Sequence, residues 1–161
     1  MRVLAFDISA SPGVAVIEVK KAKPSLIYVD SVKTDTKHTD GQRYSYVEAF
    51  AIKTIHEFGP FDVVLREKYV GDSRSKRAKQ LVYGAWAAID MALAKYGYVI
   101  DEKEHELGAT QIKMLICGKG NATKDDVANG VRRFLAEDLS FKSDDESDAC
   151  AVGLAYLIRE K

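Results

Sequence analysis

The sequence is poor in the features that mark secreted, zinc-binding and membrane proteins. It has two cysteines, Cys117 and Cys150, which lie far apart and form no Cys-x-x-Cys pair. Neither a disulfide framework nor a zinc site is indicated, and both residues are expected to be buried free thiols. No apolar run approaches the ~20 residues that cross a bilayer, and Asp7 interrupts the first apolar run too early for a secretory signal. We expect a cytoplasmic protein without a membrane partner.

The sequence also lacks net charge, because 24 Lys and Arg residues balance 24 Asp and Glu residues. An evenly charged surface exerts no long-range attraction on DNA. The neutral total is nevertheless the sum of unlike segments: residues 73–79 carry four bases and no acid, whereas residues 137–148 carry six acids and one base. Zero net charge therefore does not exclude a nucleic-acid partner. If two of those acids bind metal ions, the ions make the local charge positive at the place where a phosphate must bind.

What the sequence does contain is enough apolar material for one globular domain. Of its 161 residues, 47% are hydrophobic and 30% are charged, a composition that favours one buried core over disorder or a coiled-coil rod. No internal repeat, low-complexity segment or linker divides the chain. We expect one domain that spans residues 1–161.

The order of the apolar segments predicts a mixed α/β fold. Short runs rich in β-branched residues, separated by Gly, Pro and Ser, indicate a three-stranded antiparallel meander over residues 3–8, 14–19 and 26–32. Two further strands are expected at residues 61–65 and 98–100. Apolar residues at three- and four-residue steps predict helices at residues 44–58, 73–96, 109–116, 123–135 and 144–158. The prediction is one mixed five-stranded sheet, the meander plus two parallel strands, flanked by helices.

Four acids stand out because they adjoin apolar segments, where an unpaired carboxylate is costly. Asp7 lies near the end of the first strand, and Glu67 lies just beyond the fourth. If these strands are parallel neighbours, the two acids lie at the sheet edge where α/β folds commonly bind ligands. Asp145 and Asp148 are three residues apart at the start of the last helix, so they share one helical face.

Each of these acids also has a structural explanation. Strand-end acids form turns, and Ser143 with Glu146 has the form of a capping box, whose first-turn acids favourably meet the helix dipole. Capping accounts less well for Asp148, which precedes a nearly all-apolar segment. As a set, four carboxylates suit Mg²⁺ or Mn²⁺, and two such ions ~4 Å apart stabilise both the attacking and leaving oxygens of a phosphoryl displacement. The combination indicates nuclease chemistry.

Four short motifs, in order along the chain, resemble those of one nuclease family. VLAFDIS followed by PGVAV, within residues 3–16, resembles a first strand with a metal-binding Asp and the turn into strand two. LREKY at 65–69 resembles a strand that ends in a catalytic Glu, GKGNATK at 118–124 a Gly-x-Gly-x-Ala-x-Lys segment, and DESDACAVGLA at 145–155 a terminal Asp-x-x-Asp-Ala helix. The family is that of the RuvC-type Holliday-junction resolvases of the RNase H-like superfamily, and the resemblance runs over nearly the whole chain.

This resemblance implies an RNase H-like homodimer that grips a four-way DNA junction and makes paired nicks. It also implies two Mg²⁺ ions per active site, for which Mn²⁺ substitutes, and no organic cofactor. Carried over residue by residue, the metal ligands and catalytic acids are Asp7, Glu67, Asp145 and Asp148. Lys124 matches the basic residue of the Gly-x-Gly segment, which in the family lies close to the DNA and the active site, and it is implied to be catalytic.

Clustered bases are expected to bind the DNA backbone without reading its sequence. The main cluster directly follows the Glu67 strand end and consists of Arg74, Lys76, Arg77 and Lys79. A sparser group includes Lys119 and Lys124. Thr123 and Asp126 predict the start of a helix, where a cation such as Lys124 is mildly unfavourable, so something outside the helix is expected to interact with that charge.

The sequence departs from the family pattern in two places. Where the family often has an aromatic residue that enters the junction centre, this chain has Val70, and its aromatic residue is Tyr69, one position earlier. Tyr69 is taken as a DNA-binding residue. The helix after Ser73 keeps only Gly84 of a Leu-Gly-x-Ala-x-Gly pattern, so the dimer geometry need not be that of the family. Such variants are frequent among phage-encoded relatives, several of which cut other branched DNAs.

Three functions are consistent with these features. The first is a metal-dependent, structure-selective endodeoxyribonuclease that resolves Holliday junctions or other branched DNA by paired nicks. It would act in DNA recombination and repair or in phage DNA processing, in a bacterial cell or an infected host. The second is a YqgF-type RNA-processing nuclease, against which the pair Asp145 and Asp148 and the 118–124 segment argue. The third is a non-catalytic DNA-junction binding protein whose acids only brace the fold.

Overall fold

The first three strands form the antiparallel meander that the sequence predicts. The computed structural model describes residues 1–69 and 75–161. Three strands follow one another along the chain: β1 (Arg2–Asp7), β2 (Gly13–Lys20) and β3 (Lys23–Ser31). Asp7 pairs with Gly13, and Gly13 pairs with Ser31. The end of β1, the start of β2 and the end of β3 therefore lie at one edge of the sheet.

Two parallel strands complete the sheet, in the order β3-β2-β1-β4-β5. β4 (Val63–Glu67) runs parallel to β1, and β5 (Glu106–Leu107) runs parallel to β4. The predicted arrangement of a meander plus two parallel strands is thus confirmed.

The predicted position of the fifth strand, residues 98–100, is wrong. β5 lies at Glu106–Leu107 instead. The apolar side chains of Tyr98 and Ile100 pack against the core between the sheet and two helices, and the Tyr98 hydroxyl accepts a hydrogen bond from the Phe61 backbone N–H at 2.9 Å. The segment is apolar because it anchors a loop.

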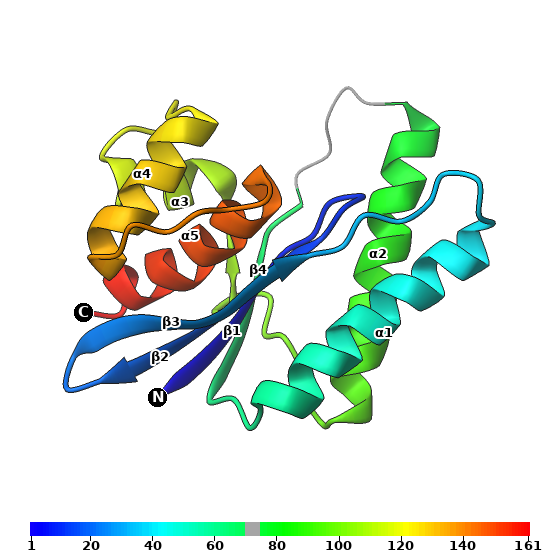
Figure 1. The fold of residues 1–161 in the computed structure, drawn as a ribbon, viewed down its shortest axis with the longest axis horizontal. Helices are drawn as coiled ribbons and strands as arrows, with labels where there is room; N and C mark the ends of the chain where they lie inside the picture. The colour runs from blue at the N-terminus through cyan, green and yellow to red at the C-terminus, as the bar shows by residue number, and fades with distance from the viewer. Residues whose placement is uncertain (70–74) are drawn as a thin grey trace.

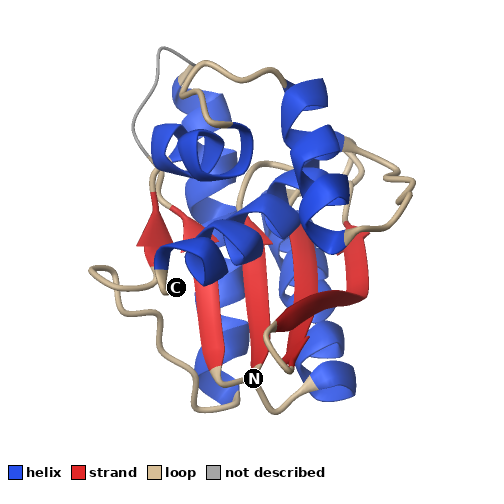
Figure 2. Ribbon diagram, turned by 90° about the vertical axis from the view of Figure 1, so that its left-hand side faces the viewer, coloured by secondary structure: helices blue, strands red, loops and turns tan. Residues whose placement is uncertain are grey.

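Helices cover both faces of the sheet (Figure 1). α1 (Asp40–Phe58) and α2 (Lys76–Lys95) lie on one face, and α3 (Ala109–Cys117), α4 (Lys124–Leu135) and α5 (Asp144–Arg159) lie on the other. Figure 2 shows this second face, with α5 lying across the strands.

Side chains of β1 alternate between two cores. Val3 and Ala5 belong to the core beneath α3, α4 and α5, whereas Leu4 and Phe6 belong to the core beneath α1 and α2. β1 is therefore a central strand buried on both faces, which explains why its sequence is apolar up to Asp7.

Capping boxes determine where two helices begin. The Thr39 side chain accepts a hydrogen bond from the Gln42 backbone N–H, and the Gln42 side chain accepts one from the Thr39 backbone N–H. α1 consequently begins at Asp40, earlier than the predicted residue 44. The predicted start of α4 is confirmed, since Thr123 and Asp126 form a capping box.

The predicted capping box between Ser143 and Glu146 is wrong, because both side chains bind elsewhere. Ser143 makes no side-chain hydrogen bond to α5, and its hydroxyl donates to the Ser31 hydroxyl at 3.1 Å. The Glu146 carboxylate is buried and accepts a hydrogen bond from the Lys142 backbone N–H at 2.8 Å. The contact between Ser143 and Ser31 fastens the start of α5 near the end of β3.

Of the two cysteines predicted to be buried, only one is fully buried. Cys150 is buried and Cys117 is half-buried, and neither is in a disulfide. Across residues 1–69 and 75–161, no helix has the length and apolar character needed to cross a membrane.

Candidate active site

The ends of β1 and β4 place two acids side by side. The strands are parallel neighbours, and Phe6 pairs with Arg66 one residue before each acid. Asp7 is buried, with 8% of its surface exposed, and Glu67 is half-buried. Burial raises the pKa of Asp7 well above its usual value, and the charge of Glu67 raises it further. Burial also raises the pKa of Glu67.

The start of α5 brings two more acids to the same edge. Asp145 accepts a hydrogen bond from the Ser9 hydroxyl, with Oγ 3.1 Å from Oδ1. The helix approaches this closely because β2 begins with Gly13, where a Cβ atom would lie 2.0 Å from the Asp145 backbone oxygen. Burial raises the pKa of Asp148. The charges of Asp145 and Asp148 both raise the pKa of Asp7, so acids from three segments share one electrostatic environment.

Lys124, the first residue of α4, forms an ion pair with Asp148. Burial alone would lower the pKa of Lys124, but its hydrogen bond to Asp148 and the neighbouring charges of Asp7 and Glu67 raise it above the usual value. A cleft of about 80 Å³ opens beside this pair. The cleft is lined by Glu67, Ala109, Ile112, Lys113, Lys124, Val127, Asp148 and Ala151. Lysine and carboxylate side chains thus line one small cleft.

The chemistry of the acids suits a divalent cation. All four are carboxylates, the hard oxygen donors that Mg²⁺ and Mn²⁺ prefer, and a cation would relieve the repulsion that raises the pKa of Asp7. Within residues 1–69 and 75–161, no three His, Cys, Asp or Glu side chains are grouped as a ready metal site. Asp148 is turned toward Lys124 and Asp145 toward Ser9.

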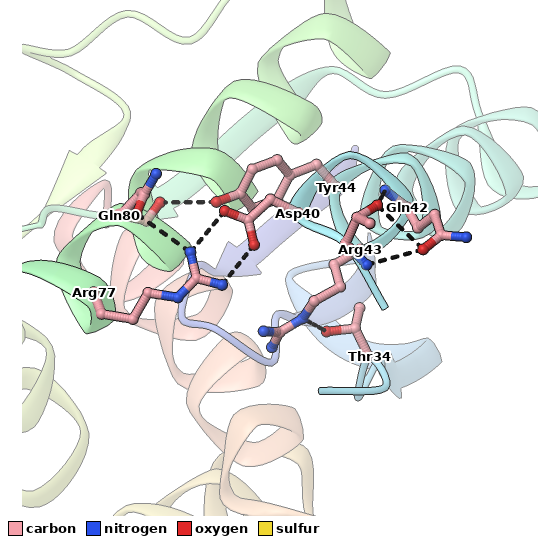
Figure 3. A network of polar contacts seen from close by, with 8 residues as sticks. Thr34, Asp40, Gln42, Arg43, Tyr44, Arg77 and Gln80 are labelled. Carbon is pink, nitrogen blue, oxygen red and sulfur yellow. Dashed lines mark hydrogen bonds and ion pairs between the residues drawn. The ribbon is translucent and has the colours of Figure 1, made fainter. Parts of the chain in front are cut away.

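Three of the four bases of the predicted DNA-binding cluster lie among the described residues, at the start of α2. Lys76 is exposed and Lys79 is half-buried, and both line an open groove on α2. Arg77 is paired: its two terminal nitrogens each lie 2.6 Å from an oxygen of Asp40 (Figure 3). Arg74 and Val70 lie outside the described residues. The DNA contacts of all four bases stay predictions.

Two further predicted DNA-binding residues have partners within the protein. The Lys119 ammonium lies 2.9 Å from Asp126, the acid of the α4 capping box. Tyr69 packs edge-on against Tyr83 and Trp86 of α2, with ring centroids 5.2 and 6.1 Å apart. Their roles in DNA binding stay predictions.

Sequence reasoning missed Arg66, which directly precedes Glu67. Arg66 is 4% exposed, and its guanidinium donates to Glu106 of β5 and to Asp90 of α2, both at 2.7 Å. The guanidinium also lies 4.0 Å from the centroid of the Trp86 ring. Arg66 therefore ties β4 to two neighbouring elements immediately before a predicted catalytic acid. The only sequence signal is a base directly after an apolar strand, which usually indicates a solvated strand end.

Comparison with known proteins identifies the family. The profile described as crossover junction endodeoxyribonuclease RuvC matches residues 7–156. The chain belongs to the RuvC family. The matched range includes all five predicted catalytic residues, Asp7, Glu67, Lys124, Asp145 and Asp148.

Individual RuvC proteins match over most of their length. RuvC of Rickettsia bellii is 28% identical over 159 residues, which are 98% of each chain. RuvC of Thermus thermophilus is 28% identical over 148 residues, which cover 89% of this chain and 84% of the relative. The structure of Thermus thermophilus RuvC in complex with a Holliday junction substrate matches with a TM-score of 0.86 and 26% identity, over 99% of this chain and 94% of that one.

These findings confirm the predicted RNase H-like fold and the predicted enzyme class. The chain is a structure-selective endonuclease of the RuvC type, the first of the three functions considered. Nucleases of this family are metal-dependent. The yeast mitochondrial Holliday junction resolvase Ydc2, at 12% identity and a TM-score of 0.55, shares the fold.

Proposed function

We propose that this RuvC-family chain resolves four-way or other branched DNA by metal-dependent paired nicking at the edge of β1 and β4. The observation that supports this proposal most directly is the meeting of Asp7, Glu67, Asp145 and Asp148 from three separate segments. Turn formation explains Asp7 or Glu67 singly and the helix dipole favours Asp145 in the first turn of α5, but neither accounts well for Asp148. Neither explains why the acids are placed where they raise the pKa of Asp7. Clustered like charges cost stability, and cation binding offsets that cost.

The four carboxylates are the proposed ligands of two Mg²⁺ ions, for which Mn²⁺ substitutes. Bound ions would offset the charge of the scissile phosphate and lower the pKa of the attacking water. Asp7 and Glu67 contribute donors from strand ends, and Asp145 and Asp148 contribute donors from the first two turns of α5. Donors on strands and helices are held more firmly than donors on loops.

Lys124 is the proposed phosphate-binding cation of the cleft. Its hydrogen bond to Asp148 raises its pKa against the effect of burial, so the ammonium stays charged at neutral pH. A phosphate that enters the cleft gives this ammonium a second anionic partner beside Asp148. Lys124 would then orient the scissile phosphate and offset part of its charge.

The proposed DNA path runs from this cleft to the start of α2. Its proposed contacts are Arg74, Lys76, Arg77, Lys79, Lys119, Lys124 and Tyr69. Lys76 and Lys79 line an open groove, which leaves them accessible to a phosphate. Arg77 and Lys119 already bind carboxylates, so exchanging these partners for phosphates gains less affinity.

We also propose a homodimer, with α2 at its interface. Tyr83, Ala87, Met91 and Ala94 follow one another at three- and four-residue steps and are exposed, Tyr83 to 55% and Met91 to 53%. An exposed apolar stripe of this kind is typical of an association surface, and paired nicks require two active sites. Light scattering should give twice the chain mass for the wild type and the single mass for Met91→Glu. A monomeric wild type would contradict the dimer.

We infer that residues 1–161 act as one nuclease domain. Both helical layers pack against the same sheet, so the acids of α5 and of the strand ends belong to one packed unit. The proposed site of action is the cytoplasm of a bacterium or of a phage-infected host, where branched DNA arises.

The test of the proposed function is cleavage of a panel of labelled substrates. The panel contains a four-way junction, a three-way junction, a flap, a plain duplex and a structured RNA. We expect paired nicks in branched DNA with Mg²⁺ or Mn²⁺, no nicks with EDTA, and little cleavage of duplex or RNA. Preferred cleavage of RNA would support the RNA-processing alternative. Junction binding without nicking in either metal would indicate the non-catalytic alternative.

A further inference from the structure

A cationic pocket lies at the start of α1, outside the proposed active site. It encloses about 160 Å³, well above the roughly 10–15 Å³ that one water requires. Its lining residues are Lys33, Thr34, Asp35, His38, Arg43 and Tyr46. The pocket therefore combines three basic side chains with one acid and one aromatic ring.

The pocket belongs to the same edge of the sheet as Asp7. β3 ends at Ser31, which pairs with Gly13, and Gly13 pairs with Asp7. The next residue, Val32, donates its backbone N–H to the Pro12 carbonyl at 3.0 Å, which fastens this segment to the loop after β1. Figure 1 shows the connection from β3 to α1 running outward from this edge. A DNA strand that crosses the active edge can therefore extend over the pocket.

The Arg43 guanidinium is held through only one of its three nitrogens. Its Nε donates to the Thr34 hydroxyl at 2.8 Å, and Thr34 is 9% exposed. The two terminal nitrogens take no partner among the described residues and point away from Thr34 in Figure 3. A guanidinium held by one nitrogen presents its remaining donors as a planar fork, the geometry that binds phosphate in a bidentate manner.

The acids near this pocket are occupied by other partners. Asp35 accepts a hydrogen bond from the Lys37 backbone N–H at 2.9 Å. Asp40 binds Arg77 through both of its oxygens, each at 2.6 Å (Figure 3). In the described part of the chain, no carboxylate forms an ion pair with Lys33 or Arg43, although, beside Arg77, the charge of Arg43 helps to lower the pKa of Asp40. Arg77 thus neutralises Asp40, and the charge of Asp35, which a backbone N–H does not neutralise, is outnumbered by those of Lys33 and Arg43, so the pocket keeps a net positive charge.

We propose that this pocket binds one backbone phosphate of the branched DNA, at a distance from the phosphate that is cut. The inference rests on the proposed function, because it requires a DNA substrate at the sheet edge. Arg43 supplies paired hydrogen bonds and Lys33 a point charge. Tyr46, 63% exposed, supplies a ring on which a sugar or an unstacked base packs. Such a contact positions the substrate and does not read its sequence.

The test compares the salt dependence of junction binding by two charge-matched variants. Lys33→Gln/Arg43→Gln removes two cations from the pocket, and Lys23→Gln/Lys53→Gln removes two exposed cations elsewhere. Binding of a labelled four-way junction is measured with EDTA from about 50 to 200 mM salt. We expect the pocket variant to bind roughly tenfold more weakly and to reduce the slope of log K against log salt by about 0.9, the value of one phosphate contact. The control variant should keep the wild-type slope.

Equal slopes and affinities for the pocket and control variants would overturn the proposal. The single variant Lys33→Gln provides a second test of the pocket. Lys33 makes no hydrogen bond in residues 1–69 and 75–161, so this change removes a cation without breaking a contact within the protein. It should weaken junction binding in the same direction without disturbing the fold. An unchanged affinity in this variant would count against the pocket.

A free phosphate offers the same chemistry, so the melting temperature is also measured with inorganic phosphate at constant ionic strength. Stabilisation of the wild type but not of the pocket variant, with unchanged junction slopes, would assign the pocket to a free anion and overturn the DNA contact. Junction cleavage with Mg²⁺ is measured in parallel on the wild type. If the wild type cleaves the junction but the pocket variant keeps the wild-type salt slope, only the proposed phosphate pocket is contradicted. If the wild type neither binds nor cleaves the junction, the proposed function is contradicted.

Discussion

Replacing Arg66 by Met should destabilise the protein strongly through one buried charge. The Arg66 side chain is 5% exposed, and its partner Glu106 on β5 is 6% exposed. The second partner, Asp90, is 51% exposed, so water solvates it when the arginine is absent. Arg66→Met therefore leaves one carboxylate buried without a cation. Asp90→Asn removes a contact that is mostly screened by solvent.

The expected free energies follow from these exposures. Leaving a buried partner unpaired costs about 3–5 kcal/mol, and the lost stacking of the guanidinium on Trp86, 4.0 Å from the ring centroid, adds about 0.5–2 kcal/mol. The exposed bridge to Asp90 contributes about 0–1 kcal/mol. For a chain of this size, 1 kcal/mol shifts the melting temperature by about 2–4 °C. Arg66→Met should lower it by on the order of 10 °C, and Asp90→Asn by at most about 4 °C.

Thermal and urea unfolding of Arg66→Met, Asp90→Asn and Arg66→Met/Glu106→Leu measure these differences. The double variant removes the uncompensated charge and should recover most of the lost stability, because apolar residues often replace a buried ion pair without a net cost. The reasoning is refuted if Arg66→Met costs no more than Asp90→Asn. It is also refuted if the double variant is less stable than Arg66→Met.

Three further predictions concern the acids and their supports. Gly13→Ala places a Cβ atom 2.0 Å from the Asp145 backbone oxygen. It should lower the free energy of unfolding by about 1–3 kcal/mol and abolish junction cleavage. The control Gly41→Ala, whose Cβ atom would meet nothing within 4 Å, should leave unfolding and cleavage nearly unchanged. Asp7→Asn should raise the melting temperature of the metal-free protein more at pH 7 than at pH 4. Burial raises the folded-state pKa above the ordinary 3.8, so the wild type loses stability as pH rises past that value and the asparagine variant does not; equal gains at both pH values would contradict this. Lys124→Met should lower the single-turnover cleavage rate at least about tenfold with a smaller change in junction affinity; loss of affinity alone would assign Lys124 to binding.

The parts of the fold that were predictable carry local sequence signals. The meander was predictable because turn residues separate short β-branched runs. The helices were predictable because apolar residues repeat at helical spacing. β5 has no such signal: it is two residues long and exists because Arg66 and Glu67 of β4 pair with Glu106 and Leu107. The apolar segment at residues 98–100 suggested a strand, although it packs under the helices.

The candidate site was predictable as a set of acids but not as a set of contacts. Asp7, Glu67, Asp145 and Asp148 adjoin apolar segments, and their motifs occur in a recognisable order. The ion pair between Lys124 and Asp148 joins residues 24 positions apart, and the bond from Arg66 to Glu106 joins residues 40 positions apart. The helix start at Thr123 predicted that Lys124 interacts outside its own helix, but no local pattern identifies Asp148 or Glu106 as a partner, because these pairs form only when the elements pack together.

Junction cleavage by the wild type and by Asp7→Asn, in Mg²⁺ and with binding measured on the same samples, tests the central claim most directly. Asp7 is the acid on which the charges of the other three converge, and asparagine removes its charge with little change of shape. We predict that the wild type nicks the four-way junction. The variant should make no nicks and should bind the junction as tightly as the wild type or more tightly. Nicking by Asp7→Asn at the wild-type rate would contradict a metal-dependent nuclease site built on these four acids.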